Sequence, residues 1–360
     1  MKDYFKYPLI SIYFYITDGC NLACRHCWIE PVYNSENFRS LSVDLFKKII
    51  DEAKPLGLKG VKLTGGEPLL HPQIKEILRI IKESNLRLVI ETNGILCSPD
   101  MVRVIKDASE NVFISVSLDG AYPETHEWLR GVKGSFSGAI EGIKNLVKEG
   151  IRPQIIMTLI RRNKEEIKDL IVLAEELGAS SIKFNVMQPH ARAKKLYEQG
   201  EALSVEELIE IGKKIESGEI KSKKLWLFFH QPMAFRPLRN MFGRDGRGCG
   251  VCMIKNIIGV LSDGSYSICG IGETIPELIF GNAEIHNLED IWYNASLLNE
   301  IREGLPNRLE GVCQKCLMKF MCMGKCIAQN YSFSGSFWSP FWFCKEAFEK
   351  GLFPQERLLP

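Results

Sequence analysis

The stretch GVKLTGGEPLLHPQIKEILRIIKESNLRLVIETNG, residues 60–94, decides the fold class of this chain. It begins with a short apolar run that ends in glycines, continues with apolar residues at helical spacing, and ends with a second apolar run. A strand, a helix and a strand in this order predict two parallel neighbours, because parallel strands need a long crossover connection.

The same unit recurs along the first half of the chain. We expect strands over residues 8–17, 60–66, 86–94, 111–120, 152–160 and 180–188. The helices expected after the first five strands cover residues 42–57, 73–84, 98–109, 136–150 and 164–178. Six strands with crossover helices predict an α/β fold, specifically a partial (β/α)6 barrel similar to a TIM barrel, with one more strand over residues 224–229. Functional residues of such folds gather at the carboxyl ends of the strands.

Composition narrows the class of protein. The chain has 360 residues, of which 45% are hydrophobic and 25% charged, which suits one large core plus a smaller module. Its formal net charge of +2 gives no reason to expect a nucleic-acid partner. The apolar N-terminal stretch is too short to span a membrane and lacks a small-residue cleavage site. We therefore expect a cytoplasmic protein without a membrane partner.

The twelve cysteines are distributed unevenly. Three lie near the start of the chain, and eight fall between Cys249 and Cys344. Clustered cysteines in a cytoplasmic chain favour metal binding over disulfides. The composition also changes near residue 240, so we expect the barrel over residues 1–240 and a cysteine-rich domain over residues 241–360.

The first cysteine group follows the first predicted strand. Cys20, Cys24 and Cys27 form a C-x3-C-x2-C loop. Three thiolates can hold three irons of a [4Fe–4S] cluster and leave the fourth iron open for another ligand. A structural zinc ion would need a fourth protein ligand.

This loop resembles the signature of the radical S-adenosylmethionine (SAM) superfamily. The resemblance implies that the open iron binds the amino and carboxylate groups of SAM. It also implies that an electron from the cluster then cleaves SAM to a 5′-deoxyadenosyl radical, which abstracts hydrogen from a substrate. Motifs at later strand ends resemble the same family and imply further contacts with SAM. The implied SAM-binding residues are Gly65, Gly66, Glu67, Pro68, Asn93, Ser117, Asp119, Arg130, Val186 and Met187.

The resemblance gives several of these residues a role. Glu67 of the GGEP motif would hold the SAM amino group, and Ser117 and Asp119 would face its ribose and methionine moieties. Arg130 would pair with the SAM carboxylate, for which a bidentate guanidinium is well suited. Val186 or Met187 would pack on adenine, although a methionine there is more often a core residue.

The second cysteine group resembles the SPASM domain of radical SAM enzymes that modify peptides and proteins. Its spacing is C-x2-C-x11-G-x4-C, then C-x2-C-x5-C-x3-C and a last lone cysteine. The resemblance implies two auxiliary [4Fe–4S] clusters, for a total of three clusters. Auxiliary cluster I would use Cys249, Cys252, Cys269 and Cys326, and auxiliary cluster II would use Cys313, Cys316, Cys322 and Cys344. A pair of zinc ribbons is the alternative.

Cys97 remains outside these ligand sets. It lies three residues after the strand-end motif that finishes at Gly94, so its thiol could donate a hydrogen atom to a substrate radical. The alternative is a small buried apolar residue near a helix start.

The SPASM resemblance implies a peptide or protein substrate that is cross-linked, epimerised or oxidised. It also implies an external electron donor such as flavodoxin or ferredoxin. No stretch before the first strand is long enough for a fused leader-peptide-binding domain, so that function would belong to a separate protein. Sulfatase-maturing enzymes place an aspartate after the cysteine of the G-x4-C motif, where this chain has Gly270.

Three alternatives stay open. A radical SAM enzyme of haem biosynthesis would act on a tetrapyrrole, whose carboxylates could meet Arg192, Lys194 and Lys195, although such a run is more often a solvated face. A maturase for a metal-cofactor oxidoreductase is the second. A non-catalytic iron–sulfur electron-transfer protein is the third, but it would need no SAM pocket.

Overall fold

A ten-stranded sheet organises the chain. The computed structural model describes residues 6–244, 246 and 250–360. The sheet order is β12-β11-β10-β1-β4-β5-β6-β7-β8-β9. The strands are β1 (Ser11–Tyr15), β4 (Gly60–Thr64), β5 (Arg87–Thr92), β6 (Val112–Ser117), β7 (Gln154–Leu159), β8 (Ser181–Val186), β9 (Trp226–Phe229), β10 (Ile257–Val260), β11 (Ser265–Ser267) and β12 (Ile279–Asn282).

All neighbours from β10 to β9 are parallel, while β11 and β12 are antiparallel. The sequence predicted the six parallel strands from β1 to β8, and the seventh, β9, also lies where it was expected. Within the described residues the sheet has two ends, β12 and β9, so it does not close. The predicted α/β fold with a partial barrel is confirmed.

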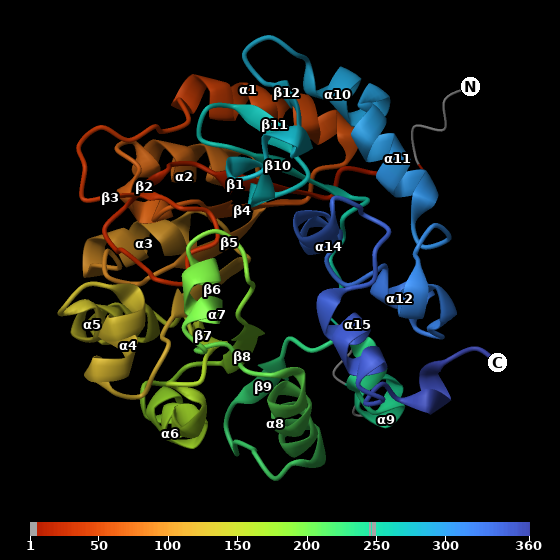
Figure 1. Ribbon diagram of the computed structural model, residues 1–360. Helices are drawn as coiled ribbons and strands as arrows, with labels where there is room; N and C mark the ends of the chain where they lie inside the picture. The colour runs from red at the N-terminus through yellow and green to blue at the C-terminus, as the bar shows by residue number, and fades with distance from the viewer. Residues whose placement is uncertain (1–5, 245, 247–249) are drawn as a thin grey trace.

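Helices cover the outer face of the sheet (Figure 1). The larger helices of the barrel are α1 (Val43–Ala53), α2 (Ile74–Glu83), α3 (Pro99–Asp107), α4 (Pro123–Arg130), α5 (Ser135–Lys148), α6 (Ile167–Glu176) and α8 (Val205–Ser217). Shorter helices are α7 (Ala193–Glu198) and α9 (Leu238–Phe242). The C-terminal helices are α10 (Leu288–Asn294), α11 (Ser296–Gly304), α12 (Gly311–Lys315), α13 (Lys319–Cys322), α14 (Ile327–Ser334) and α15 (Trp342–Glu349).

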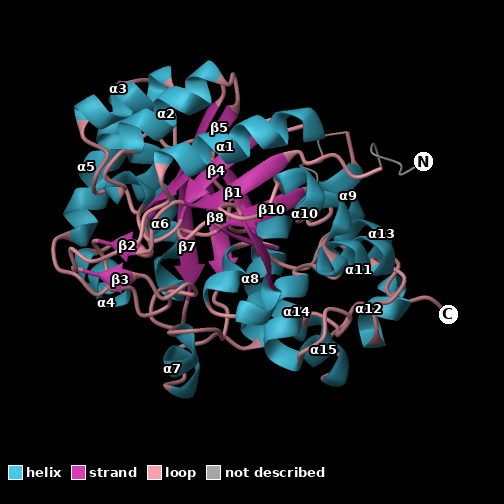
Figure 2. Cartoon of the chain, turned by 90° about the horizontal axis from the view of Figure 1, so that it is seen from above, coloured by secondary structure: helices cyan, strands magenta, loops and turns pink. Residues whose placement is uncertain are grey.

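The C-terminal part is joined to the barrel through the sheet itself. β10 pairs with β1 in parallel, with Ser11 opposite Ile257. The boundary expected near residue 240 falls inside α9. Figures 1 and 2 show α12, α14 and α15 grouped on the side of the molecule away from α3 and α5. Among the described residues, no helix is long and apolar enough to cross a membrane.

Side chains alternate between two environments along the strands. In β8, Ile182 and Phe184 are fully buried in the core, whereas Lys183 and Asn185 between and beyond them are partly exposed. In β4, Val61 and Leu63 are buried and Lys62 is partly exposed. The interior of a TIM barrel is normally filled by branched apolar side chains. Here the face of the sheet opposite the outer helices, which we call the concave face, carries polar side chains such as Lys62 and Lys183. These side chains line a cavity rather than a filled core.

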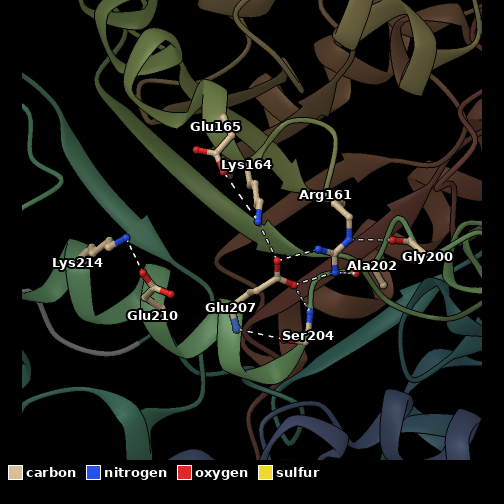
Figure 3. A network of polar contacts seen from close by, with 9 residues as sticks. All are labelled: Arg161, Lys164, Glu165, Gly200, Ala202, Ser204, Glu207, Glu210 and Lys214. Carbon is tan, nitrogen blue, oxygen red and sulfur yellow. Dashed lines mark hydrogen bonds and ion pairs between the residues drawn. The ribbon is translucent and has the colours of Figure 1, made fainter.

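A polar network fixes the loop after β7 to the start of α8 (Figure 3). Arg161 donates from both terminal nitrogens to the Glu207 carboxylate, with N–O distances of 2.9 Å each. Lys164 donates to the same carboxylate at 2.8 Å. Glu207 also forms a capping box with Ser204, whose hydroxyl accepts from the Glu207 backbone N–H.

We expect Glu207→Gln to destabilise the protein by about 1–3 kcal/mol, because charge-assisted hydrogen bonds to a partly buried carboxylate are lost. Burial disfavours the charged carboxylate, yet hydrogen bonds from Lys164, Ser204 and Arg161 outweigh it and lower the pKa of Glu207 to about 2. The stabilisation is therefore complete above the ordinary glutamate pKa and is lost as the pH falls toward 2. The melting temperatures of the wild type and of Glu207→Gln should therefore approach each other as the pH falls toward 2.

Glu210→Gln is the matched control. Glu210 pairs only with Lys214 among the contacts of this network, and both side chains are largely exposed. An ion pair at the surface contributes little to the free energy of unfolding. Equal losses for the two variants would contradict the role assigned to the Glu207 network.

Candidate active site

The three N-terminal cysteines lie on one loop after β1. Cys20 ends the short strand β2 (Gly19–Cys20), which pairs with β3 (Val32–Tyr33), and the loop continues through Cys24 and Cys27. Burial raises the pKa of Cys20 and Cys24, and raises that of Cys27 to about 11, with Cys24 adding to the effect on both neighbours. The effect of Cys24 on both neighbours shows that the three thiols lie close together, as a shared metal cluster requires, and bound metal would stabilise their ionised forms.

Two glycines allow this loop to lie against the end of β4. The Gly66 N–H donates to the Thr17 carbonyl at 2.8 Å, and the Glu67 N–H donates to the Gly19 carbonyl at 2.9 Å. A Cβ atom on Gly66 would lie 2.1 Å from the Gly19 oxygen, and Gly65 has a φ of +126°. Gly65 and Gly66 therefore permit close approach of the cysteine loop, in addition to ending the strand.

The other side of the loop is held by the end of α4. The Ala23 and Arg25 N–H groups donate to the carbonyls of Arg130 and Leu129, at 3.2 and 2.9 Å. No helix was expected around Arg130 from the sequence. The structure shows α4 there, and its last turn supports the cysteine loop.

Glu67 is nearly fully buried and accepts three hydrogen bonds. One carboxylate oxygen accepts from the Leu69 N–H at 3.1 Å and the Thr92 hydroxyl at 2.7 Å, and the other accepts from the Asn93 N–H at 2.9 Å. A carboxylate offers about four lone-pair positions, so one position remains for a ligand such as the SAM amino group. Pro68 begins the short 3-10 helix η2 (Pro68–Leu70) that Glu67 caps.

Asn93 connects the end of β5 to the cysteine loop. Its side-chain amide donates to the Asn21 side-chain oxygen at 2.7 Å, and its own oxygen accepts from the Ile95 N–H at 3.0 Å. Sequence reasoning missed Asn21. The only signal was its position between Cys20 and Cys24, which does not identify a partner 72 residues away.

Arg130 lies between a buried acid and a cysteine. Its Nε is 2.6 Å from Asp119 Oδ2, in ion-pair rather than well-aligned hydrogen-bond geometry, and its Nη1 is 3.6 Å from Cys24 Sγ. His26 Nε2 lies 3.7 Å from the same carboxylate oxygen, and burial lowers the pKa of His26 to about 4, so this imidazole is neutral. Arg130 is therefore positioned beside the three-thiol group with its charge balanced by Asp119.

Asp119 lies beside Arg130 rather than on the cavity wall. Its carboxylate is fully buried, accepts from the Thr158 N–H at 2.8 Å, and is absent from the residues that line the cavity beside the cysteines. In this position it balances the charge of Arg130, and its direct contact with ribose or methionine stays a prediction.

A cavity of about 360 Å³ opens beside the cysteine loop. It brings together most of the residues predicted to bind the cluster or SAM. Those that line it are Cys20, Cys24, Cys27, Gly65, Gly66, Glu67, Asn93, Ser117, Arg130, Val186 and Met187. Val186 is partly exposed, whereas the Met187 side chain is buried with Leu129 and Leu196, so Val186 is the better placed of the two for an adenine contact. Pro68, Asp119 and Cys97 do not line the cavity.

The cavity also contains charged residues that the sequence did not identify. Lys62, Glu91, Lys183 and His230 line it from β4, β5, β8 and the end of β9. A larger cavity of about 600 Å³ lies between α8 and α9, but no cysteine lines it. We therefore place the candidate active site in the cavity beside Cys20, Cys24 and Cys27.

The described C-terminal thiols form two groups. Burial is the main cause that raises the pKa of Cys269, and the nearby thiols of Cys326 and Cys252 raise it further. Burial and the thiol of Cys326 likewise raise the pKa of Cys252 to about 12. In the second group, burial is the main cause that raises the pKa of Cys344, and the nearby thiols of Cys313, Cys322 and Cys316 raise it further. This division matches the two ligand sets implied by the resemblance, except that Cys249 lies outside the described residues.

The second group surrounds a small apolar cavity. Cys313, Cys316, Cys322 and Cys344 all line it, together with Phe353 and other apolar residues. Four buried thiols around one cavity suit a cluster in a dry environment better than four unpaired side chains. All described cysteines are free thiols.

The ring of Tyr15 fills the space that a side chain at position 270 would need. A Cβ atom at this position would lie 2.1 Å from the Tyr15 ring, and Tyr15 is almost fully buried. An aspartate could not stand here without moving Tyr15. The geometry thus agrees with the sequence argument against a sulfatase-type base after Cys269.

Cys97 is 1% exposed and packs in the main hydrophobic core. Burial raises the pKa of its thiol to about 12. The structure does not bring this thiol to the cavity, which favours the alternative of a small core residue over a hydrogen-atom donor.

We expect Cys97→Ala to leave the reaction product unchanged and to cost about 1 kcal/mol of stability through a small cavity. Product analysis by mass spectrometry and a thermal melt check both parts. A lost or altered product from a stably folded Cys97→Ala protein would restore the donor hypothesis.

The partial barrel and its three-thiol loop define an α/β iron–sulfur protein. Family models match both parts: the radical SAM superfamily over residues 14–174, and an iron–sulfur cluster-binding domain, SPASM, over residues 249–317. The AdoMet-dependent heme synthase of Methanosarcina barkeri is 31% identical over 332 residues, which cover 89% of this chain and 92% of that protein. The chain belongs to the radical SAM superfamily and carries a C-terminal SPASM domain.

Two further likenesses involve peptide-modifying systems. The subtilosin biosynthesis protein AlbA of Bacillus subtilis is 31% identical over 190 residues, or 53% of this chain and 42% of that protein. The crystal structure of Streptococcus suis SuiB bound to S-adenosylmethionine aligns with a TM-score of 0.71 at 19% identity, covering 94% of this chain and 77% of that chain. This structural likeness shows the fold alone.

Proposed function

We propose that this chain is a radical SAM enzyme that abstracts hydrogen from a carboxylate-bearing tetrapyrrole. One observation carries the proposal: the cavity lined by the three N-terminal cysteines is also lined by Lys62 and Lys183. The likeness to a heme synthase over nearly the whole length of both proteins supports the same substrate class.

In this proposal Cys20, Cys24 and Cys27 hold the cluster that binds SAM. Bound SAM and the reduced cluster supply a radical that can remove hydrogen from unactivated carbon. Arg130 still has donors beyond those facing Asp119 and Cys24, and these would bind the SAM carboxylate. Glu67 would accept from the SAM amino group, while Ser117 and Val186 would contact its nucleoside part.

The remaining thiol groups would hold two auxiliary clusters, giving three in total. Cys269 and its group would bind auxiliary cluster I, with Cys249 as the fourth ligand. Cys344 and its group would bind auxiliary cluster II. Complete cysteine ligation would leave no iron open for substrate. Both auxiliary clusters would therefore serve electron transfer or structure. A flavodoxin or ferredoxin would be the external electron donor. Buried thiols of this kind suit a reducing compartment, and we propose a cytoplasmic location.

The test is turnover of an iron tetrapyrrole with four propionates, iron coproporphyrin III. Anaerobic holoenzyme with SAM and a reductant should consume it in step with formation of 5′-deoxyadenosine, and liquid chromatography with mass spectrometry should find haem. Rapid SAM cleavage without any change in the tetrapyrrole would contradict the proposed substrate class.

Peptide modification is the second candidate function. The identity with AlbA, a bacteriocin biosynthesis protein, favours it. A separate leader-binding protein would then present the peptide. Mass changes in small peptides encoded beside this gene, after incubation with the holoenzyme and SAM, would support this candidate over the tetrapyrrole.

A further inference from the structure

Lys183 occupies an unusual position on the concave face of the sheet. It lies in the middle of β8, opposite Ile156 of β7 and Phe228 of β9. Its neighbours Ile182 and Phe184 are fully buried in the core beneath the outer helices. Since side chains alternate along a strand, Lys183 points to the opposite side, where it lines the cavity beside the cysteine loop.

The charges around Lys183 leave it without a counterion. Lys62 is 2.7 Å from Glu91 and also lies over the Tyr13 ring at 4.6 Å, so the nearest acid is already paired. Lys183 forms no ion pair or hydrogen bond within the part of the chain that the structure describes. Burial lowers the pKa of Lys183. The charge of Glu91 partly offsets this effect, and the charge of Lys62 adds to it.

Among the described residues, Glu91 is the one acid that acts on the pKa of Lys183, and the other ionisable groups nearby add no negative charge. His230 is neutral, because burial, Lys325 and Lys183 hold its pKa well below the ordinary range. Lys325, a third lysine, also lies close enough to depress the pKa of His230. An unpaired ammonium in a confined site is costly, and an anionic ligand would offset that cost.

Two aromatic side chains continue this surface at the end of the sheet. In β9, Leu227 and Phe229 are buried, so Trp226 and Phe228 project from the concave face. Phe228 is 38% exposed and stands opposite Lys183 in the register, just beyond the residues that line the cavity. A flat apolar surface beside a cation matches a planar macrocycle with peripheral carboxylates better than a uniformly polar ligand.

We propose that Lys183 binds a carboxylate of the tetrapyrrole substrate while Phe228 packs against the face of its ring. This assignment rests on the proposed function and makes it more specific. It replaces the cations suggested by the sequence, because Lys194 and Lys195 are exposed on α7 and Arg192 donates to the Pro31 carbonyl at 2.7 Å.

The experiment measures binding of iron coproporphyrin III to anaerobic, cluster-loaded protein through the change in its Soret absorbance. Lys183→Met should raise the dissociation constant about tenfold or more, because it removes a confined charge partner. Lys183→Arg keeps the charge and should stay within about threefold of the wild-type value. Phe228→Ala should weaken binding about tenfold through lost ring contact.

Lys194→Met is the matched control, since it makes the same change at a lysine exposed on α7 that does not line the cavity, and it should bind the probe as the wild type does. The tetramethyl ester of the probe supplies a second control. It should bind weakly, and equally, to wild type and Lys183→Met, because it has no carboxylate to lose.

Two negative outcomes have different meanings. If the wild type binds and converts the probe while Lys183→Met and Phe228→Ala bind it equally well, this assignment is wrong and the proposed function stands. If the wild type cleaves SAM but neither binds nor converts the probe, the tetrapyrrole function fails and the assignment fails with it.

Discussion

Replacing Cys24 by alanine should abolish formation of 5′-deoxyadenosine from SAM. Cys24 is one of three thiols on the loop after β1, is almost fully buried, and contacts Arg130 at 3.6 Å. Outside this loop, no described cysteine lines the cavity, so no substitute ligand stands within reach. A cluster with two remaining thiolates would be lost or would no longer bind SAM productively.

The measurement combines iron content, electron paramagnetic resonance of the reduced protein and chromatography of 5′-deoxyadenosine. We expect the Cys24→Ala protein to lose about a third of its iron if three clusters are present, and to keep the signals of the auxiliary clusters. Cys97→Ala is the matched control, because it removes a buried thiol that belongs to none of the three groups. Normal SAM cleavage by Cys24→Ala would contradict the assignment of the loop.

Replacing Arg130 by leucine should lower the stability of the folded protein by about 3–5 kcal/mol, because it leaves the fully buried Asp119 carboxylate without its partner. Burial opposes ionisation of Asp119, but Arg130, followed by His26, keeps its pKa below the ordinary value. The pair therefore stabilises the fold above the ordinary aspartate pKa, and this contribution is lost in acid.

Thermal melts of cluster-loaded protein at several pH values test this expectation. The difference between wild type and Arg130→Leu should be large near neutrality. It should shrink as the pH falls toward the pKa of Asp119 in the folded wild type, which lies below the ordinary aspartate value. The double variant Asp119→Asn, Arg130→Leu should recover part of the loss, because it removes the buried charge. A pH-independent difference, or full additivity of the two substitutions, would show that the ion pair contributes nothing.

Periodicity along the chain was enough to predict the sheet. Strands such as β7 and β8 alternate buried and partly exposed residues, and the helices between strands have clear apolar stripes. The main strands β1, β4, β5, β6, β7, β8 and β9 were therefore predicted in order, whereas the short strands β2 and β3 were missed. The resemblance of the cysteine-rich segment to the SPASM domain likewise implied which thiols lie together. The periodicity is a local signal, because it depends on residues within one strand or helix.

The interior of the site depends on contacts between distant segments, which the sequence does not encode locally. Lys62 and Glu91 meet across neighbouring strands, and the only signal for them was a charged residue inside an apolar strand. The strand-end position of Asp119 likewise did not indicate that its carboxylate pairs with Arg130. Gly66 was recognised by its motif, but only the structure shows that the Gly19 backbone excludes a side chain there.

The most direct test of the account is whether the reduced holoenzyme cleaves SAM. Protein with its clusters reconstituted under anaerobic conditions and reduced with dithionite should convert SAM to 5′-deoxyadenosine and methionine. Fully reduced clusters that leave SAM intact and show no spectral change on its addition would contradict the account, and would instead favour an iron–sulfur protein that only transfers electrons.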